Sequence, residues 1–79
     1  MPSLRVQPNP TSAGWTITGL PARATLELFD AQSRSQYRAQ TTGDSAVVSA
    51  DKLPPGIYFL HVSEVGTRQP PVIMKLEKR

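Results

Sequence analysis

Apolar and polar residues alternate along short segments of this chain, and turn residues separate the segments. This period of two predicts β-strands. The clearest segment is 57–62, where both faces carry mostly apolar side chains, as in a strand in the middle of a sheet. Similar segments recur at residues 4–7, 15–18, 24–30, 35–40, 46–50 and 72–79, and none of the chain shows a helical period.

Short strands joined by turns predict an all-β fold, namely an immunoglobulin-like antiparallel β-sandwich of about seven strands. An open barrel is the alternative. A chain of 79 residues forms one domain at most. We assign residues 4–79 to this domain and residues 1–3 to a linker or to residues added at the start.

Several side chains have predictable places in such a sandwich. Trp15, the only tryptophan, shares a face with Ile17 and is expected to fill the core. Tyr58, Leu60 and Val62 share one face of the central strand. Tyr58 also follows a Pro-Pro-Gly corner, where the tyrosine of a β-sandwich commonly donates a hydrogen bond to nearby backbone.

Two turns carry further information. The Pro-Asn-Pro sequence at residues 8–10 removes two backbone donors, so we expect a kink or a switch between sheets there. Asp30 opens a turn in which its carboxylate is expected to accept hydrogen bonds from backbone amides two or three residues on.

The composition argues against catalysis. There is no cysteine, His61 is the only histidine, and the carboxylates are scattered. Glu64 would lie on the opposite face of a strand from His61, so these two side chains do not form a metal site. We therefore predict no enzyme activity, no catalytic or metal site and no cofactor.

Charge and hydropathy narrow the classes of possible binding partner. Nine basic residues exceed six acidic ones, giving a net charge of +3, but they are dispersed and have few aromatic neighbours, so we expect no nucleic-acid binding. No apolar run approaches the roughly 20 residues of a membrane span, so we expect no direct membrane insertion. Residues 1–20 lack a signal-peptide pattern, so any export peptide is expected to lie elsewhere.

Four segments together resemble the C-terminal sorting domain, type A, of the type IX secretion system, the Por system of Bacteroidota. Segment 6–10 resembles a strand ending in Pro-Asn-Pro, and segment 26–34 resembles an apolar strand ending in aspartate and an arginine turn. Segment 53–62 fits Leu-x-x-Gly-x-Tyr-x-Leu-x-Val, and segment 75–79 resembles a basic final strand. Ser33 stands where the family usually has glycine, which predicts a different turn geometry.

The resemblance implies a secretion signal and not a catalyst. It implies that a cargo domain N-terminal to this chain passes through the periplasm, and that the sandwich directs it to the type IX outer-membrane translocon. A sortase-like peptidase would then remove the sandwich, and the cargo would be attached to the cell surface or released. The implied partners are thus the translocon, the peptidase and the cargo domain.

The resemblance also assigns residues. Its structural positions are Pro8, Asn9, Pro10, Asp30, Arg34, Leu53, Gly56, Tyr58, Leu60 and Val62. We expect the translocon to recognise the final strand by β-augmentation, in which a partner pairs with an exposed sheet edge. The residues expected there are Ile73, Lys75, Leu76, Glu77, Lys78 and Arg79. The simpler interpretation is that the lysines only protect this edge from aggregation. An open edge also allows two copies of the chain to pair.

A second function is an accessory module of a secreted enzyme, either structural or carbohydrate-binding. Sugar binding requires exposed aromatic side chains on one face. The aromatic side chains available are Trp15, Phe29, Tyr37 and Phe59. Exposure of Trp15 to solvent would favour this second function.

Overall fold

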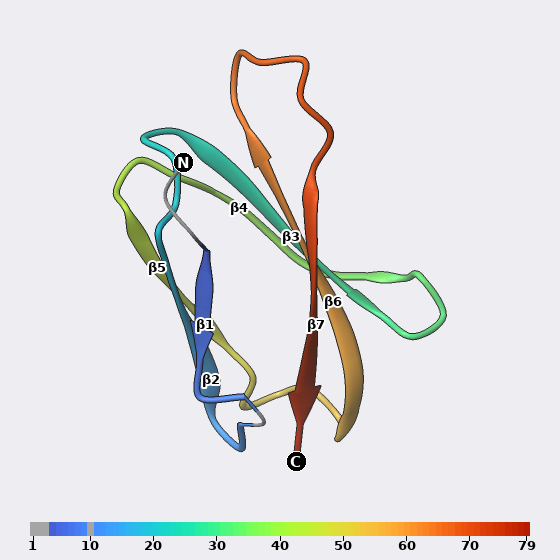
Figure 1. Cartoon of the computed structure of the whole chain (residues 1–79). Helices are drawn as coiled ribbons and strands as arrows, with labels where there is room; N and C mark the ends of the chain where they lie inside the picture. Colours follow the sequence, from blue (N-terminus) through green and yellow to red (C-terminus); the bar gives the residue numbers. More distant parts are fainter. Residues whose placement is uncertain (1–3, 10) are drawn as a thin grey trace.

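The computed structural model describes residues 4–9 and 11–79, and these form two layers of strands (Figure 1). Every element among the described residues is a strand, which confirms the predicted all-β fold. The predicted segments agree with the observed bounds to within two residues. The strands are β1 (Arg5–Gln7), β2 (Gly14–Thr18), β3 (Ala24–Asp30), β4 (Ser35–Thr41), β5 (Ser45–Ser49), β6 (Gly56–Glu64) and β7 (Val72–Lys78).

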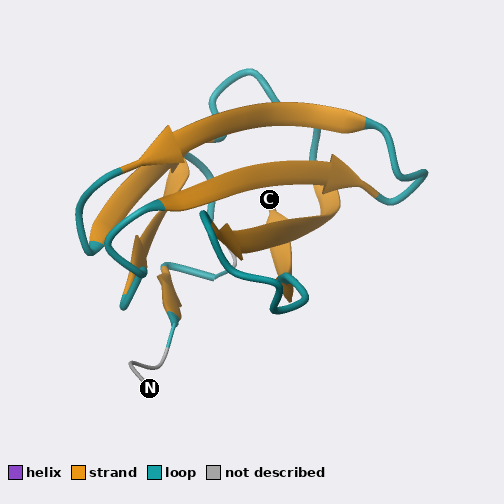
Figure 2. Ribbon diagram, turned by 90° about the horizontal axis from the view of Figure 1, so that it is seen from above, coloured by secondary structure: helices purple, strands orange, loops and turns teal. Residues whose placement is uncertain are grey.

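The two sheets are antiparallel and differ in size. The smaller has the order β1-β2-β5 and the larger the order β4-β3-β6-β7. The chain therefore crosses between the sheets after β2, β4 and β5, as in an immunoglobulin-like sandwich. Figure 2 shows the two layers from above. β6 lies between β3 and β7, which confirms the prediction that it is a central strand.

The core lies between the inner faces of the two sheets. Trp15 is fully buried at 0% exposure, and its ring lies 6.1 Å from that of Tyr58, centroid to centroid. The prediction that Trp15 fills the core is thus confirmed. The other fully buried large side chains come from both sheets and alternate along their strands, as the period of two predicts: Ile17, Leu26, Leu28, Val48, Leu60 and Leu76.

The outer face of the larger sheet carries half-buried side chains. His61 is one of them, and its ring packs against that of Phe29 at a tilt of 55°, with 4.5 Å between the centroids. Within the described ranges, no three His, Asp or Glu side chains gather as a metal site would require. No helix able to cross a membrane occurs in the same ranges.

Candidate functional site

The final strand, β7, is an edge strand of the larger sheet. One side of it pairs with β6, from Val62 opposite Val72 to Gly56 opposite Lys78. The other side faces away from β6, and backbone groups on such a side are open to another strand. The recognition site predicted from the sequence therefore lies on a sheet edge.

Two residues from the start of the chain cover the C-terminal half of that edge. The Asn9 Nδ2 donates to the Lys75 carbonyl at 3.2 Å, and its Oδ1 accepts from the Glu77 N–H at 2.9 Å. The Thr11 N–H donates to the Glu77 carbonyl at 3.0 Å, and the Arg79 N–H donates to the Thr11 carbonyl at 2.7 Å. The Asn9 side chain therefore extends the parallel pairing with β7 that Thr11 makes through its backbone.

This contact links the start of the chain to the larger sheet. β1 belongs to the smaller sheet, yet Thr11 forms a parallel bridge with Lys78 of the larger sheet. β2 then continues the smaller sheet, so the predicted kink or switch between sheets takes the form of this one bridge and the chain does not change sheets there. The structure assigns Asn9 a direct role in closing the sandwich. Pro8 precedes it with a cis Gln7-Pro8 peptide bond, and Pro10 lies outside the described residues.

The six predicted recognition residues divide into two groups. Ile73, Lys75, Glu77 and Arg79 are exposed. Leu76 and Lys78 instead point into the sandwich, with exposures of 1% and 8%. The side chains of these two residues are therefore closed to a partner that docks on the folded domain, and we correct the expectation for both.

Lys78 has a structural role. Its Nζ donates to the Ala50 carbonyl at 2.7 Å and to the Leu53 carbonyl at 3.0 Å. A buried ammonium group is tolerated when hydrogen bonds replace its water. These two bonds attach the end of β7 to the connection between β5 and β6. Lys78 therefore does not protect the edge, and among the two lysines of β7 only Lys75 faces outward.

The Pro-Pro-Gly corner holds the start of β6. The Tyr58 hydroxyl donates to the Pro54 carbonyl at 2.5 Å, which confirms the predicted bond to nearby backbone. Gly56 has a φ of +151°, which an L side chain rarely adopts, so glycine is needed at this change of direction. Leu53 packs against the core from the other end of the corner.

The turn after β3 is organised by Asp30. The Asp30 Oδ1 accepts the Gln32 and Arg34 backbone N–H groups at 2.9 Å each, and its Oδ2 accepts the Arg34 Nε at 2.8 Å. The Arg34 backbone N–H is the main reason that the pKa of the Asp30 carboxyl lies below its ordinary value. Ser33 adopts a left-handed φ of +66°, so the prediction of a different turn geometry was wrong. Serine occupies the conformation that suits glycine.

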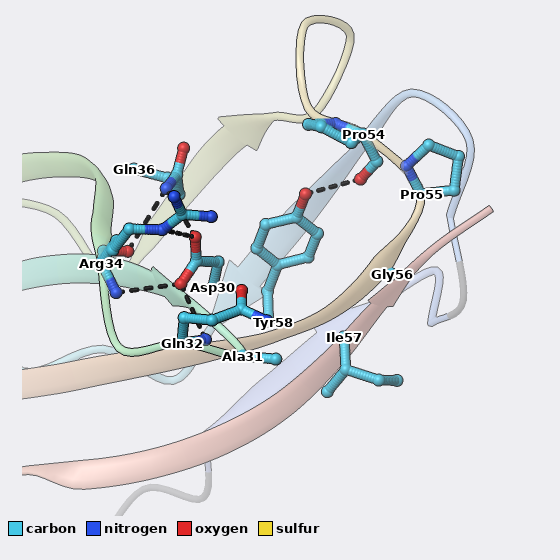
Figure 3. Close-up of a pocket in the computed structure, with 10 residues that line it drawn as sticks. All are labelled: Asp30, Ala31, Gln32, Arg34, Gln36, Pro54, Pro55, Gly56, Ile57 and Tyr58. Carbon is cyan, nitrogen blue, oxygen red and sulfur yellow. Dashed lines mark hydrogen bonds and ion pairs between the residues drawn. The ribbon is translucent and has the colours of Figure 1, made fainter.

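Two motifs far apart in the sequence meet at one hollow. Asp30 stands opposite Tyr58 in the pairing of β3 with β6. Burial raises the pKa of the Tyr58 hydroxyl, and the negative charge of Asp30 adds to this. The Asp30–Arg34 turn and the corner at Pro54 and Gly56 line a hollow of about 320 Å³ (Figure 3). The bonds of Asp30 and of the Tyr58 hydroxyl therefore fix the shape of this hollow.

Tyr58→Phe is expected to lower the free energy of unfolding by about 1 kcal/mol, since it removes the hydroxyl bond to Pro54 but keeps the ring in place. For a domain of this size the melting temperature should fall by about 4–8 °C. Thermal unfolding followed by circular dichroism measures this. Tyr37→Phe, at a half-exposed ring on β4, is the matched control. Equal melting of wild type and Tyr58→Phe would show that the bond contributes nothing.

A family model described as "Secretion system C-terminal sorting domain" matches residues 5–74, most of the chain. PorZ of Porphyromonas gingivalis, described as an essential bacterial surface component of the type-IX secretion system, has a solved structure similar to this one. The TM-score is 0.86 at 20% identity, over 98% of this chain and 11% of that chain. Among curated proteins no match is found.

The structure and the comparisons define the class. The molecule is an immunoglobulin-like β-sandwich, and the likeness to PorZ supports that fold. The chain belongs to the family of secretion system C-terminal sorting domains of the type IX system, which confirms the resemblance seen in the sequence. This is a family of sorting signals and not of enzymes.

Proposed function

We propose that this chain is a non-catalytic sorting label that takes a cargo protein to the type IX outer-membrane translocon. The family match over residues 5–74 carries this proposal. The cargo precedes residue 1, passes through the periplasm and reaches the cell surface or the medium. A sortase-like peptidase cuts on the N-terminal side of the sandwich.

The placement of the chain ends suits such a label. In Figure 1, β1 begins at the opposite end of the sandwich from the end of β7. Cargo that precedes β1 therefore lies at the opposite end of the sandwich from the last residues of β7. The outward side chains of β7, from Ile73 to Arg79, supply the contacts by which the translocon distinguishes this edge.

Deleting residues 77–79 from a reporter fused before residue 1 is expected to leave the reporter in the periplasm of cells that have the type IX machinery. The deletion also removes the bonds of Glu77, Lys78 and Arg79, so it tests folding and recognition together. Lys75→Glu separates the two effects, because this side chain is exposed and its backbone bonds remain. Lys75→Arg is its control.

Surface delivery and periplasmic content are measured by fractionation. We expect Lys75→Glu to melt within a few degrees of wild type and to lower surface delivery. Normal surface delivery of the 77–79 deletion would contradict recognition through β7. A reporter that stays in the periplasm with the intact chain would contradict the sorting function itself.

The accessory-module function receives less support. A sugar platform needs exposed aromatic rings, and Trp15, the largest ring, is fully buried. Phe29 and Phe59 are only partly exposed on the outer face of the larger sheet. Tyr37, at 38% exposure, is the most exposed aromatic residue in the described ranges.

A further inference from the structure

Among the residues that the structure describes, Asn9 and Thr11 cover only part of the edge of β7. The backbone groups of Lys75, Glu77 and Arg79 that bond to Asn9 and Thr11 all point away from β6. Since backbone direction alternates along an antiparallel strand, the N–H and carbonyl of Ile73 and the N–H of Lys75 point to the same side. Asn9 and Thr11 contact none of these three groups, which lie at the N-terminal half of the strand.

The open half differs from the covered half in its side chains. Val72 and Ile73 are adjacent, so they lie on opposite faces of the sheet, and both are exposed, at 48% and 56%. Exposed aliphatic side chains on both faces of an open edge are unusual, because edge strands commonly carry charges that prevent pairing. An added strand would cover both side chains.

A hollow lies beside this half. It holds about 120 Å³ and is lined by Leu4, Pro21, Val62, Pro70 and Val72, with Glu64 also in its wall. The residues come from the segment just before β1, the connection after β2 and the hairpin of β6 and β7. It therefore lies between the edges of the two sheets, at the end where the chain enters. Its size suits one branched aliphatic side chain.

We propose that the secretion machinery adds one short extended segment to β7 at residues 72–75, with an aliphatic side chain of that segment in the hollow. This inference rests on the proposed function and names the chemistry of the partner. The three open backbone groups require a strand, because a helix has no free backbone groups to offer them along its length. Asn9 limits the added strand, since it already occupies the Lys75 carbonyl and the Glu77 N–H.

The test removes a single backbone donor. Ile73→Pro deletes the N–H that points to the open side, and proline is tolerated at such an edge position because no bond to β6 is lost. Ile73→Val keeps the N–H and serves as the control. Val72→Asp places a charge in the wall of the hollow at a side chain that is half exposed already. Each variant is made in the reporter fusion and also as purified protein.

We expect Ile73→Pro and Val72→Asp to remain folded in thermal melts and to lower surface delivery by about two- to tenfold, the range that corresponds to one lost hydrogen bond. Ile73→Val should be delivered like wild type. If Ile73→Pro does not fold, Val72→Asp alone decides. Normal delivery of a folded Val72→Asp or a folded Ile73→Pro would overturn the inference.

Two further outcomes distinguish the possible occupants of the β7 edge and separate this inference from the proposed sorting function. If purified wild type forms a dimer in analytical ultracentrifugation and Ile73→Pro makes it monomeric, a second copy of the chain occupies the edge, and the inference is overturned. If the wild-type fusion itself is not delivered, the sorting function fails and this inference fails with it. Delivered wild type together with normally delivered, folded variants overturns this inference alone.

Discussion

Leu60→Ala is expected to lower the free energy of unfolding by about 2–4 kcal/mol. Leu60 is fully buried in the central strand β6, opposite Leu28 of β3 and Met74 of β7. Truncation leaves a cavity at the centre of the larger sheet. A domain of this size is stable by about 4–8 kcal/mol, so the variant should lose a large part of its stability.

Chemical denaturation measures this effect. Val47→Ala is the matched control, because Val47 also lies in a strand but is 69% exposed. Its free energy of unfolding should change by no more than about 0.5 kcal/mol. A Leu60→Ala midpoint equal to that of wild type would mean that the core does not depend on β6.

Asn9→Ala is expected to lower the free energy of unfolding by about 1–3 kcal/mol, because two hydrogen bonds to β7 are lost and the Lys75 carbonyl and the Glu77 N–H lose their partners. Stability should fall locally, at the contact of Asn9 with β7, as well as for the whole domain. The Glu77 amide should exchange with solvent much faster, whereas the Leu28 amide in the interior of the sheet should follow only the global change.

Denaturation and amide hydrogen exchange by NMR measure the two parts. Asn9→Asp is the informative companion, since it keeps an acceptor for the Glu77 N–H and loses the donor to the Lys75 carbonyl. We expect it to retain part of the Glu77 protection. Unchanged Glu77 protection in Asn9→Ala would show that the side chain does not hold the strand.

The strands were predictable from the sequence because the signal is local. Alternation within five to nine residues places Trp15, Leu26 and Leu60 on inner faces, and the structure confirms each. The interruption of strand pairing near Asn9 was predictable too, since two prolines prevent ordinary pairing there. The partner of the Asn9 side chain was not predictable, because it lies 66 to 68 positions away.

Lys78 and Ser33 show two other limits of prediction from the sequence. The period of two that places Leu76 inside also places Lys78 inside, but its charge suggested an outward position. Only the carbonyls of Ala50 and Leu53, brought close by the fold, make the inward position favourable. Ser33 keeps a left-handed φ because Asp30 accepts the amides on both sides of it, and this local bonding outweighs the preference for glycine.

The contact of Asn9 and Thr11 with β7 has a consequence for biosynthesis. Residues 9 and 11 are synthesised before their partners at positions 75–79, so these bonds form only after translation has reached the final strand. Contacts of such long sequence separation also make folding slow. A chain that ended before residue 75 would keep Asn9 and Thr11 without these partners. The fully paired β7 therefore forms only once both the first and the last part of the sandwich have been synthesised.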